Sequence, residues 1–223
     1  MGQGHHDPQS CLEGDGTHSK KKSLYATEQR TQKVRLERAR FVKLIRRFCA
    51  SRFVFLDEFG CNTAMTRRYA RGKSGKRVRS YTPVNYGPNV SVLAAMRQGG
   101  IEASMRVEGA TSGAVFLAFL KHFLVPKLKQ GDIVVMDNLA AHKVDGVHQL
   151  ITSAGARVLY LPPYSPDYNP IELAFSKIKG FLRSKAAWTK ESLDQALTQA
   201  FACVTASDTA GWIGHCGYAL LNR

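Results

Sequence analysis

Two short runs of uninterrupted apolar residues constrain the fold more than any other feature of this sequence. Residues 53–56 read Phe-Val-Phe-Leu, and residues 133–136 read Ile-Val-Val-Met. Continuous runs of this length are typical of strands buried on both faces, as in sheets that helices cover. We therefore expect an α/β domain built around a central sheet.

The remaining patterns predict that this sheet is mixed. Residues 90–96 and 101–107 flank a Gly-Gly pair and predict a hairpin, and residues 157–161 predict a further strand. An antiparallel meander followed by parallel crossover units is the architecture that this order favours. Helices are predicted over residues 23–48, 112–129, 143–154, 169–188 and 190–205.

The composition excludes several classes of protein. With 223 residues, 44% of them hydrophobic and 22% charged, the chain is expected to form one sizeable globular domain plus an appendage. No apolar stretch approaches the roughly 20 residues of a membrane span, and the N-terminus has no signal-peptide pattern. The five cysteines form no C-x-x-C motif, so neither a disulfide framework nor a zinc site is expected, and a reducing cytosol fits better.

The charge predicts an acidic partner. Lys and Arg number 32 against 17 Asp and Glu, a formal net charge of +15. The basic residues cluster, and residues 67–79 contain seven of them and no acid, in what reads as a loop or hairpin tip. Such clusters suit contact with phosphates, although Lys and Arg runs also form ordinary solvated surfaces. The candidate DNA-binding residues are Arg67, Arg68, Arg71, Lys73, Lys76, Arg77, Lys143, Lys177 and Lys179.

Two aspartates directly follow the apolar runs. Asp57 comes after residues 53–56, and Asp137 comes after residues 133–136. If the two strands are parallel neighbours, these carboxylates converge where open α/β sheets bind ligands, and a hard cation such as Mg²⁺ would relieve their repulsion. The chemistry expected there is metal-assisted phosphoryl transfer, with one ion activating a nucleophile and the other stabilising the leaving oxygen. Alternatively, either Asp is only the first polar residue of a loop or a helix cap, with Asn138 as a turn former.

A proline-rich segment supplies a third acid. Residues 161–172 read Leu-Pro-Pro-Tyr-Ser-Pro-Asp-Tyr-Asn-Pro-Ile-Glu, and the four prolines predict a stiff loop between a strand and a helix. Asn169 suits the helix N-cap and Pro170 the first helical position. Glu172 either completes a capping box or is aimed by the loop at the strand ends.

Three motifs in this order resemble the catalytic domain of mariner-superfamily transposases, most of all the bacterial insertion-sequence branch. They read Phe-Leu-Asp-Glu-Phe-Gly around Asp57, Val-Met-Asp-Asn-Leu-Ala-Ala-His-Lys around Asp137, and the proline-rich segment that ends in Glu172. Thirty-four residues separate Asp137 from Glu172, the spacing of that family's Asp-Asp-Glu triad. The resemblance extends over about residues 52–218.

The resemblance implies a fold, a reaction and a set of roles. The fold would be ribonuclease-H-like, with a mixed five-stranded sheet flanked by helices. Asp57 and Asp137 would bridge two Mg²⁺ ions, for which Mn²⁺ can substitute, and Glu172 would complete one ion's shell. His142 would have a structural or DNA-positioning role, and Asn138, Asn169 and Pro170 would support the site.

The family cuts DNA at transposon ends and joins the freed 3′-hydroxyl to target DNA, typically at TA. Its members act as dimers on paired ends, so the implied partners are transposon-end and target DNA and a second copy of the chain. The implied location is the bacterial cytosol, at the nucleoid.

The expected organisation departs from the family in its N-terminal part. Residues 1–19 are expected to be a disordered tail, residues 20–51 a basic helical linker that remains from a helix-turn-helix region, and residues 52–223 the catalytic domain. The chain is then a catalytic half of a split or truncated transposase, with a possible helix-turn-helix partner chain. Alternatives are a catalytically silent DNA-binding remnant and a ribonuclease-H or resolvase-type nuclease, against which the proline-rich segment argues.

Overall fold

A computed structural model describes residues 26–219 of the chain. The expected disordered tail and residues 20–25 of the expected basic linker lie outside the described residues. The strands are β1 (Phe53–Cys61), β2 (Val90–Arg97), β3 (Gly100–Glu108), β4 (Ile133–Met136) and β5 (Arg157–Tyr160). The α-helices are α1 (Gln32–Ile45), α2 (Gly113–Phe119), α3 (Val147–Ser153), α4 (Ile171–Lys185), α5 (Lys190–Ala202) and α6 (Ala206–His215).

The strands form one mixed five-stranded sheet in the order β3-β2-β1-β4-β5. β1, β2 and β3 pair antiparallel, whereas β4 pairs parallel with β1 and with β5. The predicted meander followed by parallel crossovers is therefore confirmed. Gly99 and Gly100, both at positive φ, form the predicted tight connection between β2 and β3.

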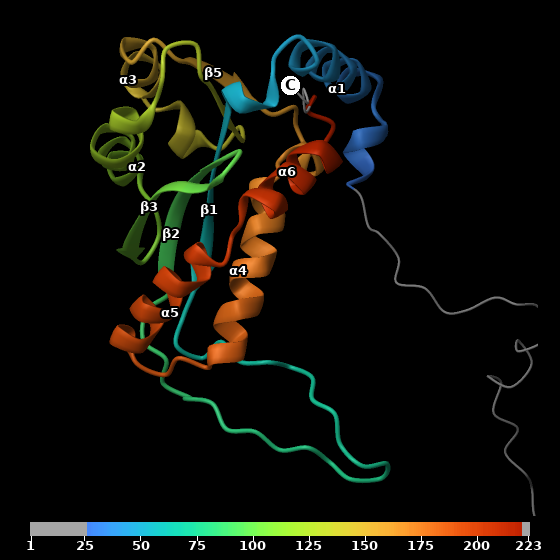
Figure 1. Cartoon of the computed structure of the whole chain (residues 1–223), viewed down its shortest axis with the longest axis vertical. Coiled ribbons are helices and arrows are strands. Elements are labelled where there is room, and N and C mark those ends of the chain that lie inside the picture. The colour runs from blue at the N-terminus through green and yellow to red at the C-terminus, as the bar shows by residue number, and fades with distance from the viewer. Residues whose placement is uncertain (1–25, 220–223) are drawn as a thin grey trace, which may run out of the picture.

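Helices cover both faces of this sheet, which therefore has two hydrophobic cores (Figure 1). Alternate residues of β1 point to opposite sides: Phe53 and Phe55 belong to the core under α1, α4, α5 and α6, whereas Val54 and Leu56 belong to the core under α2 and α3. This alternation explains why the run at residues 53–56 is apolar without interruption. Among residues 26–219, no helix has both the length and the apolar character that a membrane span requires.

Several predicted boundaries were wrong for identifiable reasons. β1 continues through Asp57 to Cys61 because β2 remains paired with it up to that residue. The helix predicted from residue 143 begins at Val147, after Gly146 at φ 95° and a 3₁₀ turn (Ala140–Lys143). The helix predicted over residues 112–129 is α only to Phe119, and then becomes a π turn and a 3₁₀ turn that contains Pro126.

The two ends of the described chain also differ from prediction. In the helix predicted over residues 23–48, residues 23–25 lie outside the described part, and α1 begins only after Thr31, whose side chain accepts a hydrogen bond from the backbone N–H of Val34. At the other end, α5 is followed by a separate helix, α6. Thr205 and Asp208 form a capping box at its start.

A long basic loop connects β1 to β2. This basic loop (residues 62–89) contains no helix or strand and extends away from the sheet, beyond the lower end of α4 (Figure 1). All its residues from 67 to 82 are exposed. The prediction of a loop for the charged segment 67–79 is confirmed.

Candidate active site

The candidate site lies where β1 and β4 diverge. β1 remains paired with β2 as far as Cys61, whereas its parallel pairing with β4 ends at Phe55. Asp57 lies two residues beyond that last pair, and Asp137 directly follows β4. The two strands are parallel neighbours, as the predicted convergence of these aspartates required, although Asp57 lies within its strand and not after it.

A cavity of about 570 Å³ occupies this divergence. Its lining includes all three predicted acids, Asp57, Asp137 and Glu172, which come from β1, from the end of β4 and from the first turn of α4. The proline-rich loop (residues 161–172) provides most of the remaining wall. Further lining residues are Asn138, Leu139, Leu161, Pro162, Pro163, Tyr164, Ser165, Pro166 and Asn169.

Asp57 is the most enclosed of the three acids, with 8% of its surface exposed. Its carboxylate accepts hydrogen bonds from the Glu58 backbone N–H at 2.7 Å and from the Asn169 side-chain amide at 2.8 Å. Burial nevertheless raises the pKa of Asp57 to about 7, and the negative charges of Glu172 and Asp137 contribute to this rise. Near neutral pH this carboxyl therefore needs a positive charge beside it to remain fully ionised.

Asp137 lies in a different electrostatic environment. Its carboxylate is 2.6 Å from Nδ1 of His142, a contact without the alignment of a good hydrogen bond, and accepts a bond from the Leu139 N–H at 3.1 Å. Burial alone would raise the pKa of Asp137, but the contact with His142 and the Leu139 N–H outweigh it and hold the pKa below its ordinary value. Asp137 therefore stays ionised more readily than Asp57.

His142 is fixed by its own surroundings. The side chain is buried, and its ring stacks on Phe116 with 4.3 Å between centroids. Its backbone carbonyl accepts a hydrogen bond from the Tyr160 hydroxyl at 3.1 Å. His142 therefore contacts Asp137 from a position that its own packing fixes.

The proline-rich loop leads into α4, and Glu172 in the first turn of this helix does not cap it. α4 begins at Ile171, Pro170 occupies the N-cap position, and no side chain caps the helix. The predictions of Asn169 as the cap and of Pro170 as the first helical position were therefore wrong, and of the two alternatives for Glu172 the capping box is not formed. The Asn169 amide reaches across the cavity to Asp57 instead, and its Oδ1 is buried without a hydrogen-bond partner among the described residues.

Tyr164 lies at the mouth of this cavity. It has a φ of 55°, a left-handed conformation that non-glycine residues seldom adopt, and the residue is 52% exposed. Its backbone carbonyl accepts a hydrogen bond from the side-chain amide of Gln29.

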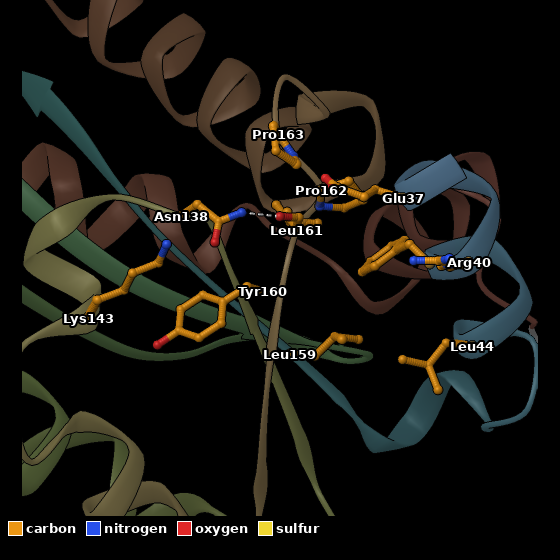
Figure 2. Close-up of a pocket in the computed structure, with 11 residues that line it drawn as sticks. Glu37, Arg40, Leu44, Asn138, Lys143, Leu159, Tyr160, Leu161, Pro162 and Pro163 are labelled. Carbon is orange, nitrogen blue, oxygen red and sulfur yellow. Dashed lines mark hydrogen bonds between the residues drawn. The ribbon is translucent and has the colours of Figure 1, made fainter. Parts of the chain in front are cut away.

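A second groove adjoins the cavity. With a volume of about 540 Å³, it has α1 as one wall and β5 with the start of the proline-rich loop as the other (Figure 2). Asn138 lies between the two spaces and donates its side-chain amide to the Leu161 carbonyl. Lys143 lines the groove, with its ammonium 5.5 Å from the centre of the Tyr160 ring.

The predicted DNA-binding residues are dispersed around the site and not in it. Six of them lie on the exposed part of the basic loop, outside the lining of the cavity: Arg67, Arg68, Arg71, Lys73, Lys76 and Arg77. On α4, Lys177 pairs with Asp208 at 2.5 Å, and Lys179 lies 5.5 Å from the centre of the Phe59 ring. Lys143 alone lies beside the site, in the adjoining groove.

The donors around the cavity fit a divalent cation. Carboxylate and carboxamide oxygens are the ligands that Mg²⁺ and Mn²⁺ prefer. The raised pKa of Asp57 and the unpartnered Oδ1 of Asn169 both indicate an environment that lacks a positive charge. Within residues 26–219, no three His, Cys, Asp or Glu side chains are already close enough to share one ion.

A comparison with protein families identifies the family of this chain. The family model described as "DDE superfamily endonuclease" matches residues 52–194. No curated protein matches the chain significantly.

Solved structures of a mariner transposase share the fold. The Mos1 transposase paired-end complex with left transposon end has a TM-score of 0.75 at 17% identity, covering 91% of this chain and 64% of that one. The Mos1 mariner paired-end complex with Mn gives 0.75 at 18%, with the same coverage. The Mos1 catalytic domain alone gives 0.60 at 14%, covering 88% of this chain and 98% of that one. The chain thus has the predicted ribonuclease-H-like fold and spans 64% of the two longer Mos1 chains.

Proposed function

Because the chain belongs to the DDE superfamily of endonucleases, we propose that it is the catalytic part of a transposase, which cuts DNA at transposon ends and joins those ends to target DNA. The observation that carries this proposal is the meeting of Asp57, Asp137 and Glu172 around one cavity at the divergence of β1 and β4. Three motifs far apart in the sequence supply these acids.

The three carboxylates would hold two divalent ions, Mg²⁺ with Mn²⁺ as a substitute. When bound, such ions make water nucleophilic and stabilise the leaving oxygen of a phosphodiester. The Mos1 structures include complexes with Mg and with Mn. Asp57, Asp137 and Glu172 would be the residues that hold these ions.

Neighbouring residues prepare these ligands. His142 orients the Asp137 carboxylate, and its contact helps that acid stay ionised. The Asn169 amide donates to one oxygen of Asp57 and the Glu58 backbone N–H donates to the other, so each oxygen keeps one further lone pair with which it could bind a metal. Such supporting contacts set ligand geometry and typically affect metal affinity or activity about 10- to 100-fold.

DNA is the substrate that the charge favours. The chain has a net charge of +15, and the basic loop presents its cations fully to solvent. Contacts from this loop, from Lys143 and from Lys177 and Lys179 would follow the phosphate backbone without reading sequence. The expected assembly is a homodimer on paired DNA ends in the bacterial cytosol.

A plasmid-nicking assay tests this function. Purified protein with Mg²⁺ or Mn²⁺ is expected to relax supercoiled plasmid, and a chelator should abolish the reaction. Asp137→Asn should lower nicking by at least about 1,000-fold, because several kcal/mol of charge stabilisation is lost, while retention of DNA on the protein stays unchanged.

Asp145→Asn provides the matched control. It removes the same charge from an exposed position eight residues further along, outside the cavity lining, and should nick like wild type. Equal nicking by Asp137→Asn and wild type would refute the assignment. Salt-sensitive DNA binding with no metal-dependent nicking by the wild type would instead favour a catalytically silent DNA-binding remnant.

A further inference from the structure

An arginine of α1 forms hydrogen bonds to side chains of the proline-rich loop. Nη1 and Nη2 of Arg38 donate to the two carboxylate oxygens of Asp167 at 2.9 and 2.6 Å, and Nη1 also donates to the Ser165 hydroxyl at 2.7 Å. The two partners are about 130 residues apart in the sequence. A guanidinium that forms two parallel bonds to a carboxylate fixes orientation as well as distance.

This pair is less exposed than two other ion pairs on the surface. The side chains of Arg38 and Asp167 are 19% and 38% exposed, whereas both partners are 42% or more exposed in the Arg106–Asp194 and Lys190–Glu108 pairs. Exposed pairs contribute little because water and salt screen them. The partly buried, bidentate contact of Arg38 therefore has the geometry of a structural restraint.

The residue after Asp167 is held from two directions. The Arg38 guanidinium lies 4.4 Å from the centre of the Tyr168 ring, and the Phe41 ring stacks on Tyr168 with 5.4 Å between centroids. From the other side, the Tyr218 hydroxyl donates to the Tyr168 carbonyl at 2.9 Å. Tyr218 itself packs on Phe53 of β1, with 4.8 Å between ring centroids.

The restrained segment leads directly into the catalytic cavity. Asn169, which donates to Asp57, is the next residue after Tyr168, and Glu172 follows three residues later. A shift of Asp167 and Tyr168 would therefore displace both the amide that orients one predicted metal ligand and the helix start that carries another.

We propose that Arg38 is a positioning residue for DNA cleavage: its grip on Asp167 and Tyr168 holds the proline-rich loop so that Asn169 and Glu172 are placed at the catalytic cavity. This inference rests on the proposed function. It assigns to α1, outside the matched family region, a part in the activity of the site.

The test compares Arg38→Ala, Asp167→Asn and the double variant. Asp167→Asn preserves the size of the side chain, so it keeps the proposal testable where Arg38→Ala perturbs folding. Three quantities are measured: kcat and KM for nicking with Mn²⁺, Mn²⁺ affinity without DNA by electron paramagnetic resonance, and the thermal unfolding midpoint.

Each single variant should lower kcat and Mn²⁺ affinity about tenfold, as loss of outer contacts to a metal site does. KM for DNA should remain within about twofold. The double variant should lose no more than the worse single variant, since the two side chains act as a unit. An additive double variant, a change in KM alone, or unchanged kcat and Mn²⁺ affinity in folded single variants would overturn the proposal.

Two further variants control for charge. Arg35→Ala removes one positive charge from an exposed position of the same helix and should resemble wild type. Arg38→Lys keeps the charge without the planar fork and should remain impaired, whereas full activity would contradict positioning by the fork. If the wild type does not nick DNA, the proposed function fails, and the Mn²⁺ affinities still decide the role of Arg38.

Discussion

The proline-rich loop and the basic loop contrast in how they are held. In the proline-rich loop, Pro162, Ser165 and Asn169 are buried, and side chains from α1, from Tyr218 and from β1 contact it. In the basic loop, by contrast, every residue from 67 to 82 is exposed. One connection is part of the packed domain and the other extends into solvent.

This contrast matches two physical requirements. Groups that bind a metal must be held within about 0.5 Å of the productive geometry, which only a packed and hydrogen-bonded segment achieves. A charge acts on a phosphate over a screening length of about 8 Å in physiological salt, so it tolerates imprecise placement. We therefore expect substitutions in the two loops to affect different measurements.

The largest effect should come from the acid that the proline-rich loop contacts. Since burial raises the pKa of Asp57 to about 7, the metal-free protein should lose stability as pH rises from about 4 to about 8, by at most about 4 kcal/mol. Thermal unfolding with chelator present measures this. Asp57→Asn should be more stable than wild type at pH 8 and nearly independent of pH in this window. A wild type that gains stability over the same range would contradict the effect of burial on the Asp57 carboxyl.

Asn169→Ala should have the next largest effect. It removes the amide that orients Asp57, so kcat for nicking should fall about 10- to 100-fold with KM for DNA unchanged. Steady-state nicking kinetics provide the measurement, and Asn62→Ala in the basic loop serves as the amide control. A change in KM without a change in kcat would place Asn169 among the DNA contacts instead.

Neutralising the basic loop should change binding alone. In the variant with Arg67→Gln, Arg68→Gln and Arg71→Gln, the slope of log affinity against log salt concentration should become shallower by about three. Fluorescence anisotropy with labelled duplex at several salt concentrations measures the slope. The unfolding midpoint should stay within about 1 °C, because these side chains are exposed. A large loss of stability would show that the basic loop packs like the proline-rich loop.

The smallest effect is expected at Tyr164, the strained residue of the proline-rich loop. Asn tolerates a φ of 55° better than Tyr does, so Tyr164→Asn should raise stability by less than about 1 kcal/mol. That corresponds to an unfolding midpoint about 2–4 °C higher for a domain of this size. Tyr69→Asn, at an exposed position of the basic loop, should leave the midpoint unchanged. Equal shifts in the two variants would argue against local strain.

The sequence allowed the sheet to be predicted because its signals are local. The apolar runs at residues 53–56 and 133–136, and the Gly-Gly turn before residue 101, each fall within a few residues. The continuation of β1 to Cys61 could not be predicted in this way, because Asp57 and Glu58 have a loop-like composition and only pairing with β2 keeps them in the strand.

The sequence predicts the three acids of the candidate site but not the residues that hold them in place. Asp57, Asp137 and Glu172 stand next to recognisable local patterns. The capping interpretation of Asn169 failed because its actual partner, Asp57, is 112 residues away. The contacts of Arg38 with Asp167 and of Tyr218 with Tyr168 also join residues far apart in the sequence, so no local pattern indicates them. The start of α6 is different, because its capping signature, Thr-x-x-Asp from Thr205, is local and can be recognised in the sequence.

The divergence of β1 from β4 affects what happens when a mutation inactivates such a domain. The hollow between the strands is created by the backbone pairing pattern and not by the acids that line it. A single change of Asp137 to a neutral residue would therefore leave the fold intact and the affinity for DNA unchanged. Such inactive copies would compete with active copies for the same DNA sites without cutting them.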